Sequence, residues 1–224
     1  MQISGKNIGR EEKIRAVIAY FQETMPEPET ELTYESPYEL IVAVILSAQC
    51  TDKRVNLITP AFFRKFPGPV QLAAARLEEV FEMIKSCSYP NNKAKHLVGM
   101  ARVLVDEFDN QIPKDIDSLQ KLPGVGRKSA NVIAAVIHKM PVMPVDTHVF
   151  RVSARIGLTR GAKTPLQAEN QLYEVFPGDL IPHAHHWLIQ HGRYVCQARK
   201  PKCTACGLQE VCSYHQNKAP ESIT

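Results

Sequence analysis

Four of the six cysteines in this 224-residue chain lie close together, between residues 196 and 212. Six, two and five residues separate them in turn, and they are Cys196, Cys203, Cys206 and Cys212. Four thiolates on one short loop are typical of a tetrahedral metal site rather than of disulfides. The ligand type leaves zinc and a [4Fe–4S] cluster equally open, because both accept four cysteines. The remaining two, Cys50 and Cys87, are interpreted as small buried hydrophobic side chains.

Hydrophobic residues recur at helical spacing along nearly the whole chain, beginning with Ile14, Val17, Ile18 and Phe21. The pattern predicts further helices over residues 52–66, 72–86 with one possible break, 92–108, 118–122, 128–137, 147–156, 165–176 and 183–191. No stretch alternates with period two for long enough to predict a strand. The sequence therefore predicts an all-α fold.

Local signals predict where several of these helices begin and end. Ser36, Pro37 and Glu39 form a capping pattern ahead of the apolar run 40–46, which predicts a helix buried on all sides. Thr164-Pro165 predicts a second capped start. Gly157 and Gly192 are each predicted to end a helix, because glycine suits the left-handed cap.

Composition excludes several classes of protein. With 44% hydrophobic and 22% charged residues, the chain is neither disordered nor fibrous. Its longest apolar run, 40–46, is far shorter than the ~20 residues of a membrane-spanning helix. No apolar segment typical of a secretory signal follows the first charges, so a cytoplasmic protein is expected.

Positive charge is concentrated in one part of the chain. The formal net charge is only +4, but residues 121–202 carry 12 Lys and Arg against 4 Asp and Glu. Such a concentration is typical of a surface that binds a polyanion. The alternative is a solvated basic face without a partner.

A Pro- and Gly-containing turn, 122–126, separates two predicted helices. Gly124 and Gly126 allow a tight turn whose free amides, at the start of the next helix, could hold a phosphate. The first helical turn normally favours acidic residues, yet here it carries Arg127 and Lys128. A bound phosphate would explain these cations; alternatively they simply reach into solvent.

Two residues are candidates for catalysis. Lys128, beside another cation and partly buried at the positive end of a helix, would favour the neutral, nucleophilic amine that forms a Schiff base. Asp146, directly before the helix 147–156, could manage the protons of such a reaction. The alternative for Asp146 is an ordinary N-cap. Basic residues in and before the cysteine loop, a second candidate phosphate contact, are Arg193, Arg199, Lys200 and Lys202.

Taken together, the chain resembles the endonuclease III family of DNA glycosylases. The resemblance rests on Leu46-Ser47-Ala48-Gln49-x-Thr51-Asp52, on Leu122-Pro123-Gly124-Val125-Gly126-Arg127-Lys128, on Val145-Asp146-Thr147-His148-Val149-Phe150-Arg151, on the segments 185–189 and 191–194, and on the four cysteines. It implies a two-domain helix-hairpin-helix glycosylase fold, and the cysteine spacing then matches a [4Fe–4S] loop.

The resemblance also implies how the domains are arranged along the chain. Residues 30–140 would form a six-helix barrel, with the helix-hairpin-helix motif at about 115–137. Residues 1–29 and 141–224 would form the helical iron–sulfur cluster domain, with the cluster loop at 196–212.

The implied activity is that of a bifunctional DNA glycosylase and AP lyase of base excision repair. It would flip oxidised pyrimidines out of double-stranded DNA, with Lys128 as nucleophile and Asp146 assisting proton transfer. β-Elimination would then cut the strand 3′ to the abasic site. A monomer associated with the nucleoid through DNA binding is expected.

Further DNA contacts follow from the resemblance. Gln49 matches the residue that enters the space left by the flipped nucleotide, and Asp52 and His148 match positions near the site. Tyr89 stands where the family commonly places a leucine wedge, and an aromatic ring can stack into the gap instead. This departure leaves the opposite-base preference open.

Two other classes remain as alternatives. One is a monofunctional adenine or mismatch glycosylase, which generally lacks the lysine seen at position 128. The other is a non-catalytic iron–sulfur module that binds DNA or transfers electrons. The presence of both Lys128 and Asp146 favours the bifunctional enzyme.

Overall fold

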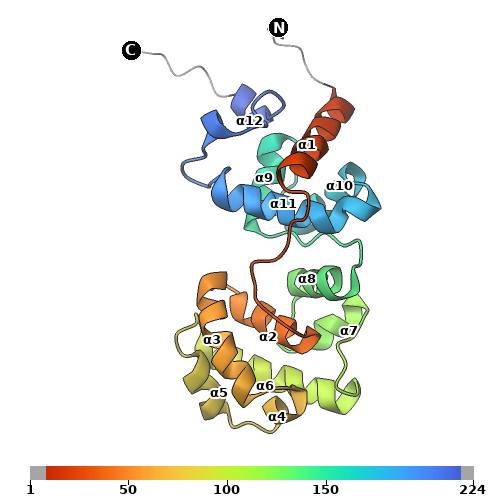
Figure 1. Cartoon of the computed structure of the whole chain (residues 1–224). Coiled ribbons are helices and arrows are strands. Elements are labelled where there is room, and N and C mark those ends of the chain that lie inside the picture. The colour runs from red at the N-terminus through yellow and green to blue at the C-terminus, as the bar shows by residue number, and fades with distance from the viewer. Residues whose placement is uncertain (1–8, 218–224) are drawn as a thin grey trace. The chain divides into compact units, whose positions relative to one another are not determined.

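The computed structural model describes residues 9–217, and within this range it contains helices and no strand, which confirms the predicted all-α fold (Figure 1). The chain divides into two compact units. Residues 30–142 form the central unit, and residues 9–29 with 143–217 form the terminal unit. No helix in the described part of the chain is both long and apolar enough to cross a membrane.

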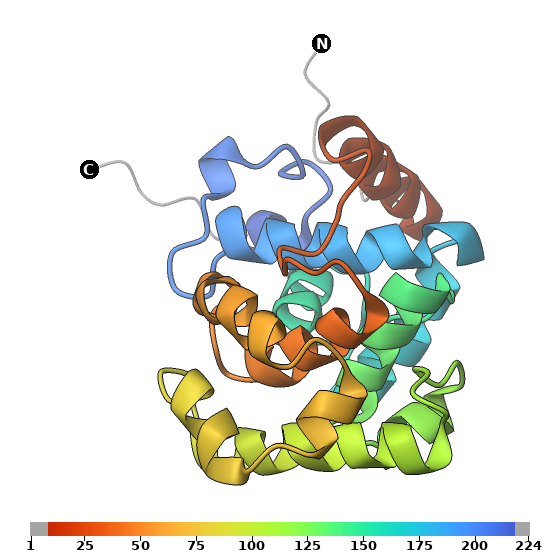
Figure 2. The ribbon, with the colours of Figure 1, turned by 60° about the horizontal axis from the view of Figure 1, so that its bottom comes forward.

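The central unit is built around one buried helix. Its helices are α2 (Pro37–Ser47), α3 (Asp52–Lys65), α4 (Pro69–Ala73), α5 (Leu77–Ile84), α6 (Pro90–Glu107), α7 (Ile116–Lys121) and α8 (Arg127–His138). Every residue of α2 from Leu40 to Leu46 is buried, as its uninterrupted apolar run predicted. The helix contacts α3, α6 and α8, which lie around it in both ribbon views (Figures 1 and 2).

The terminal unit combines the first helix of the chain with the last ones. It contains α1 (Arg10–Thr24), α9 (Thr147–Ile156), α10 (Pro165–Val175), η1 (Gly178–Leu180), α11 (Ile181–Tyr194), η2 (Cys203–Ala205) and α12 (Ser213–Gln216). Phe21 of α1 stacks on Trp187 of α11 with 5.6 Å between ring centroids. The indole of Trp187 donates a hydrogen bond to the Met25 carbonyl at 2.7 Å, so the end of α1 is joined to α11.

Most of the local start signals are confirmed. Ser36 caps α2 by accepting a hydrogen bond from the Glu39 amide at 3.2 Å, and Thr164 caps α10 in the same way. Gly157 ends α9 in the left-handed conformation, with φ of 92°. These caps could be predicted from the sequence because each depends on residues within one helical turn.

Two helix boundaries differ from the prediction. Gly192 does not end α11, which continues to Tyr194. A Cβ atom at Gly192 would lie 3.0 Å from side-chain atoms of His148 and Val152, so this glycine allows α9 and α11 to pack closely. The predicted helix 72–86 begins earlier and is divided into α4 and α5, because the backbone becomes extended at Arg76.

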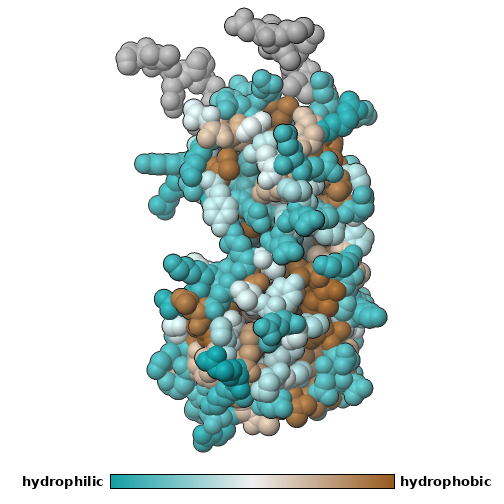
Figure 3. Space-filling model, viewed as in Figure 1, coloured by the Kyte–Doolittle hydropathy of each residue, from teal (hydrophilic) through white to brown (hydrophobic). Residues whose placement is uncertain are grey.

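Polar residues dominate the face drawn in Figure 3, where hydrophobic residues appear in separate areas. A few large hydrophobic side chains are nonetheless exposed in the described part of the chain. They are Leu57, Val70, Leu77, Tyr89, Leu166 and Tyr194. Scattered exposure of this kind is normal, but Tyr89 stands out because it is also a candidate site residue.

Candidate functional site

The turn before α8 has the geometry of a backbone anion site. The Val125 amide bonds to the Leu122 carbonyl at 3.0 Å, which closes a tight turn. Gly124 has φ of 84°, and a Cβ atom there would lie 2.9 Å from Cβ of His96, so both backbone and space require glycine. Gly126 has φ of −84° and open space around it, so only one of the two glycines is needed for the turn.

The first turn of α8 presents its amides and two cations together. Gly126 is the N-cap, and no side chain caps this helix. Arg127 and Lys128 occupy the first two helical positions, and both are exposed. The exposure corrects the expectation that Lys128 is partly buried, because its side chain extends from the surface end of the helix. This helix start therefore combines amide donors, the positive end of a dipole and two exposed cations.

Gln49 and Tyr89 lie on two adjoining segments of the central unit. The Ser88 hydroxyl donates a hydrogen bond to the Gln49 carbonyl at 2.6 Å, which holds the two segments together. Both Gln49 and Tyr89 have φ of 54°, in the left-handed region that non-glycine residues seldom adopt. Both side chains are exposed, Tyr89 to 62%. Strained, exposed residues on paired loops are typical of binding sites.

Asp52 is the first residue of α3, directly after the N-cap Thr51, whose hydroxyl accepts from the Arg54 amide. It is half-buried and borders an open depression together with Glu31 and Asn56. Position alone therefore explains Asp52 as an acidic residue in a first helical turn.

Asp146 is the N-cap of α9 in the terminal unit. One carboxylate oxygen, Oδ1, accepts hydrogen bonds from the amides of His148 and Val149, each at 2.8 Å. Both bonds go to Oδ1, so the cap uses only half of the carboxylate. His148 is the second residue of the helix, and its Nδ1 is 3.2 Å from the guanidinium of Arg151. The structure thus brings Asp146 and His148 together, whereas Lys128 belongs to the central unit.

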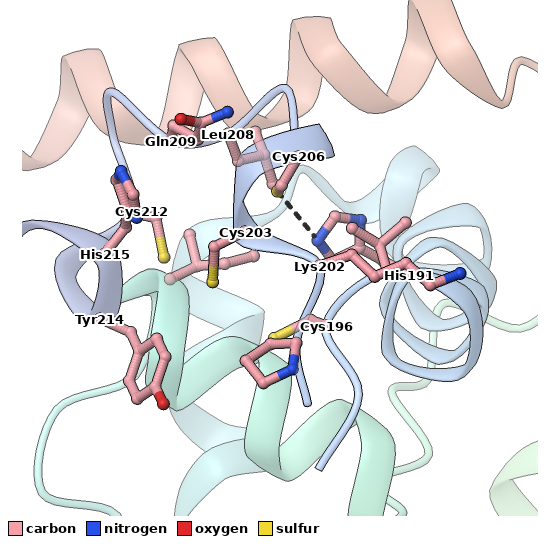
Figure 4. A pocket seen from close by; sticks show the side chains of 13 residues that line it. His191, Cys196, Lys202, Cys203, Cys206, Leu208, Gln209, Cys212, Tyr214 and His215 are labelled. Carbon is pink, nitrogen blue, oxygen red and sulfur yellow. Dashed lines mark hydrogen bonds between the residues drawn. The ribbon is translucent and has the colours of Figure 1, made fainter. Parts of the chain in front are cut away.

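The four clustered cysteines line one pocket of the terminal unit (Figure 4). Their thiols are free, and no three His, Cys, Asp or Glu side chains among residues 9–217 converge closely enough to hold a single metal ion. Burial raises the pKa of the Cys206 and Cys212 thiols, and the charges of the neighbouring cysteines raise it further. Four thiolates in this pocket would therefore repel one another without a positive centre between them.

Two arginines that the sequence did not single out hold the cysteine loop to α9. The guanidinium of Arg155 donates to the carbonyls of Gln197 and Ala198 at 2.8 Å and lies 3.5 Å from Sγ of Cys196. It also covers the ring of Tyr214 at 4.7 Å, so it joins both ends of the loop. Arg151 donates to the carbonyls of Gly192 and Cys196. A guanidinium group can donate several hydrogen bonds at once because it is planar and has several N–H donors.

His191 is a further pocket residue, which lies in one of the segments that carry the resemblance and is not among the predicted site residues. Its Nε2 is 3.6 Å from Sγ of Cys206, and burial lowers its pKa to about 4. It also packs edge-on against Phe21 of α1. The imidazole therefore stays neutral at physiological pH and contributes a packing surface beside the thiols.

The basic residues of the loop are placed outside this pocket or at its rim. Arg199, Lys200 and Lys202 are exposed, and Lys202 borders the pocket. Arg193 is half-buried near the end of α11. The loop thus combines an inner face of thiols with an outer face of cations.

A family model described as HhH-GPD superfamily base excision DNA repair protein matches residues 42–178. This match covers the central unit from α2 onward and α9 and α10 of the terminal unit. The fold and the turn before α8 therefore define a helix-hairpin-helix protein of base excision DNA repair.

Individual similar proteins define the family more narrowly than this model does. The chain is 44% identical to endonuclease III of Rickettsia conorii over 91% of this chain and 97% of that protein. It is 41% identical to endonuclease III of Bacillus subtilis over 88% and 90% of the two chains. A trapped covalent intermediate of endonuclease III with DNA has the same fold, with a TM-score of 0.87, 38% identity, and coverage of 92% of this chain and 97% of that one. The chain belongs to the endonuclease III family.

Proposed function

We propose that this protein is a bifunctional DNA glycosylase and AP lyase that removes oxidised pyrimidines from double-stranded DNA. The observation that carries the proposal is the turn 122–126 leading into α8, with Lys128 in the first helical turn, in a chain of the endonuclease III family. The relatives' covalent and non-covalent DNA complexes support both DNA binding and a covalent step.

In the proposed mechanism, Lys128 is the nucleophile. Its Nζ, once deprotonated, attacks C1′ of the flipped nucleotide, and the bond from C1′ to the base breaks. Bound DNA would cover this exposed lysine and exclude water from it. Flipping itself costs a few kcal/mol and is easier for a damaged base that stacks poorly.

Asp146 assists this reaction in the proposal. The amide bonds to Oδ1 hold the carboxylate rigidly at the start of α9. It would stabilise the developing positive charge at C1′ or accept a proton from the attacking amine. His148, beside it on α9, would line the same site.

Strand cleavage follows from the Schiff base. Opening of the C1′–O4′ bond of the sugar converts the amine adduct into this imine. The imine makes the 2′ proton acidic, and removal of that proton expels the 3′ phosphate by β-elimination. Water then releases Lys128 from the cleaved sugar, so the enzyme returns to its starting state. The overall reaction transfers no electrons to or from the protein.

The remaining DNA contacts fall into two groups. Backbone amides at Gly124 and Gly126, with Arg127, would hold a phosphate without reading sequence. Gln49 would fill the space of the flipped nucleotide while Tyr89 stacks between neighbouring bases, and Asp52 would lie nearby. A second backbone contact would come from the outer face of the cysteine loop, formed by Arg193, Arg199, Lys200 and Lys202.

The cysteine pocket is the proposed site of a [4Fe–4S] cluster held by Cys196, Cys203, Cys206 and Cys212. All four thiols line the pocket, and their spacing of six, two and five residues matches the [4Fe–4S] loop of the family, which favours a cluster over a single zinc ion. When bound, the cluster would stiffen the loop that carries the cations. We infer that the terminal unit is the cluster domain and the central unit the six-helix barrel of the family.

The cellular setting follows from the substrate. We propose a monomer in the cytoplasm that associates with the nucleoid through DNA binding. The concentration of positive charge in residues 121–202 supports this, because it includes both proposed phosphate contacts.

Borohydride trapping tests the proposed function. The protein is incubated with a duplex containing thymine glycol, or an abasic site, and sodium borohydride is added. We expect a covalent protein–DNA adduct that is absent in Lys128→Ala and retained in Lys114→Ala, an exposed lysine elsewhere in the central unit. Base release without an adduct would support a monofunctional glycosylase. DNA binding without base release or an adduct would support a non-catalytic module.

Optical spectroscopy and metal analysis test the cluster. The purified protein should be brown and contain iron and sulfide, because a [4Fe–4S] cluster absorbs visible light. A colourless protein that contains zinc would contradict the assignment.

A further inference from the structure

Cys50 and Cys87, the two cysteines outside the pocket, lie next to each other in the central unit. Cys50 follows α2 and Cys87 follows α5, so they come from segments far apart in the sequence. The bond from the Ser88 hydroxyl to the Gln49 carbonyl joins the residue after one cysteine to the residue before the other. The Cys50 thiol lies near enough to Cys87 for its charge to raise the pKa of Cys87. A disulfide between the two residues would place their sulfurs ~2.05 Å apart.

A buried lysine is part of the same cluster. Lys93 of α6 is only 4% exposed, and its ammonium donates to the carbonyls of Leu46 and Ala48, each at 2.8 Å. This ammonium holds the end of α2 in place and contributes a positive charge beside both cysteines. This charge opposes, in part, the larger effect by which burial raises the pKa of Cys87.

The two thiols differ in their exposure to solvent. Cys87 is 5% exposed and Cys50 is half-buried, so a reagent from solution meets Cys50 first. Burial, and next the neighbouring Cys50, raise the pKa of Cys87 to about 11. Cys50 is therefore the attacking thiol, and Cys87 the one that resolves the first product.

We propose that Cys50 and Cys87 form a reversible dithiol–disulfide pair that a small-molecule disulfide, such as oxidised glutathione, oxidises. The Cys50 thiolate attacks one glutathione sulfur, forms a mixed disulfide and releases one glutathione thiolate. Cys87 then attacks Sγ of Cys50 and releases the second. The protein loses two electrons and two protons, and oxidised glutathione becomes two molecules of glutathione.

The bridge would join the two segments that carry Gln49 and Tyr89. Both residues are in the left-handed conformation and sit one and two residues from the cysteines, so the bond would restrict how far the segments separate. Disulfides in reducing compartments are generally transient and redox-sensing, which fits a pair that closes only under oxidising conditions.

Peptide mapping of the full, cluster-loaded protein tests the proposal. The protein is treated with oxidised glutathione, its free thiols are alkylated, and it is digested with trypsin. We expect peptide 86–93 joined to peptide 16–53, and separation of the two by reductant. Visible absorbance measured in parallel shows that the cluster cysteines take no part.

Single-cysteine variants sharpen this test. Cys87→Ser cannot resolve the mixed disulfide, so it should retain glutathione on Cys50 at a level at least about tenfold above wild type. Cys50→Ser should leave Cys87 unmodified, because that thiol is buried. Cys87→Ala repeats the first variant without a buried hydroxyl, in case the serine disturbs folding.

Two results would overturn the proposal. One is wild-type protein that retains glutathione on Cys50 as fully as Cys87→Ser, with no joined peptide. The other is a wild-type protein in which neither cysteine reacts while the protein remains folded. Neither result bears on glycosylase activity, which the borohydride experiment measures separately.

Discussion

Replacing Asp146 with asparagine or alanine separates its two roles, because only one of them requires a charge. The carboxylate caps α9 through two 2.8 Å hydrogen bonds to backbone amides, and it is also the proposed catalytic acid or base. Asparagine keeps an oxygen for the cap but carries no charge. Alanine removes both the cap and the charge.

The expected effects on stability follow from the cap. Asp146→Ala should lower the free energy of unfolding by about 0.5–2 kcal/mol. At roughly 2–4 °C for each kcal/mol in a chain of this size, thermal denaturation would shift by several degrees. Asp146→Asn should lower the free energy of unfolding by less, because asparagine caps helices about as well as aspartate does. Only the interaction of the charge with the helix dipole is lost, which is about 0.3–1 kcal/mol.

The expected effects on activity are different. Both variants should slow base excision by roughly 10²–10⁴-fold, the range for loss of a general acid or base. Thr164→Ala is the matched control, because Thr164 caps α10 of the same unit through its hydroxyl. It should lose comparable stability while excision continues at the wild-type rate. Single-turnover excision and thermal denaturation followed by circular dichroism give the two quantities.

The catalytic role of Asp146 is refuted if Asp146→Asn excises damaged bases within a few-fold of the wild-type rate. Asp146 would then be a structural cap alone, and the proton transfer would belong to another group. The catalytic role is also refuted if Thr164→Ala loses activity to the same degree, because destabilisation would then explain the loss in both variants.

Three further variants give independent tests. Gly124→Ala should weaken DNA binding measured by fluorescence anisotropy, because φ of 84° and contact with a histidine both oppose a side chain, whereas Gly178→Ala, in open space outside the proposed DNA contacts, should bind as wild type does. Gly192→Leu should destabilise the fold by about 1–3 kcal/mol through overpacking between α9 and α11, while Ala154→Leu on the exposed side of α9 should have little effect in chemical denaturation. Arg155→Ala should lose about 1.5–3 kcal/mol and reduce bound iron, and lysine should not restore it, because one ammonium cannot replace a planar group that bonds two carbonyls.

The helices and their capped starts were largely predictable, because short stretches of sequence specify them. The apolar run 40–46 predicted a buried helix, and Ser36 and Thr164 predicted caps that the structure confirms. Errors occurred where packing between distant segments decides the outcome. Gly192 has the sequence signature of a helix end, yet its missing side chain serves the contact between α9 and α11.

The candidate site was likewise predictable from the sequence only in part. The spacing of the cysteines indicated a common site, and the structure places all four around one pocket. The partial burial expected for Lys128 was wrong, because burial depends on what surrounds a side chain in three dimensions. Arg155 and His191 gave no recognisable signal, since each acts through residues that are at least 15 positions away.

By itself the sequence determined an all-α chain, its turn before α8, the cap at Asp146 and a loop with four thiols. Each of these depends on hydrogen bonds or backbone preferences within a few residues, so local sequence is sufficient. Only the tertiary structure decided that Lys93 is buried beneath the end of α2 and that the segments of Cys50 and Cys87 lie side by side. Those contacts join residues about 40 positions apart, and they form only when packing of the whole unit offsets the entropy of bringing distant segments together.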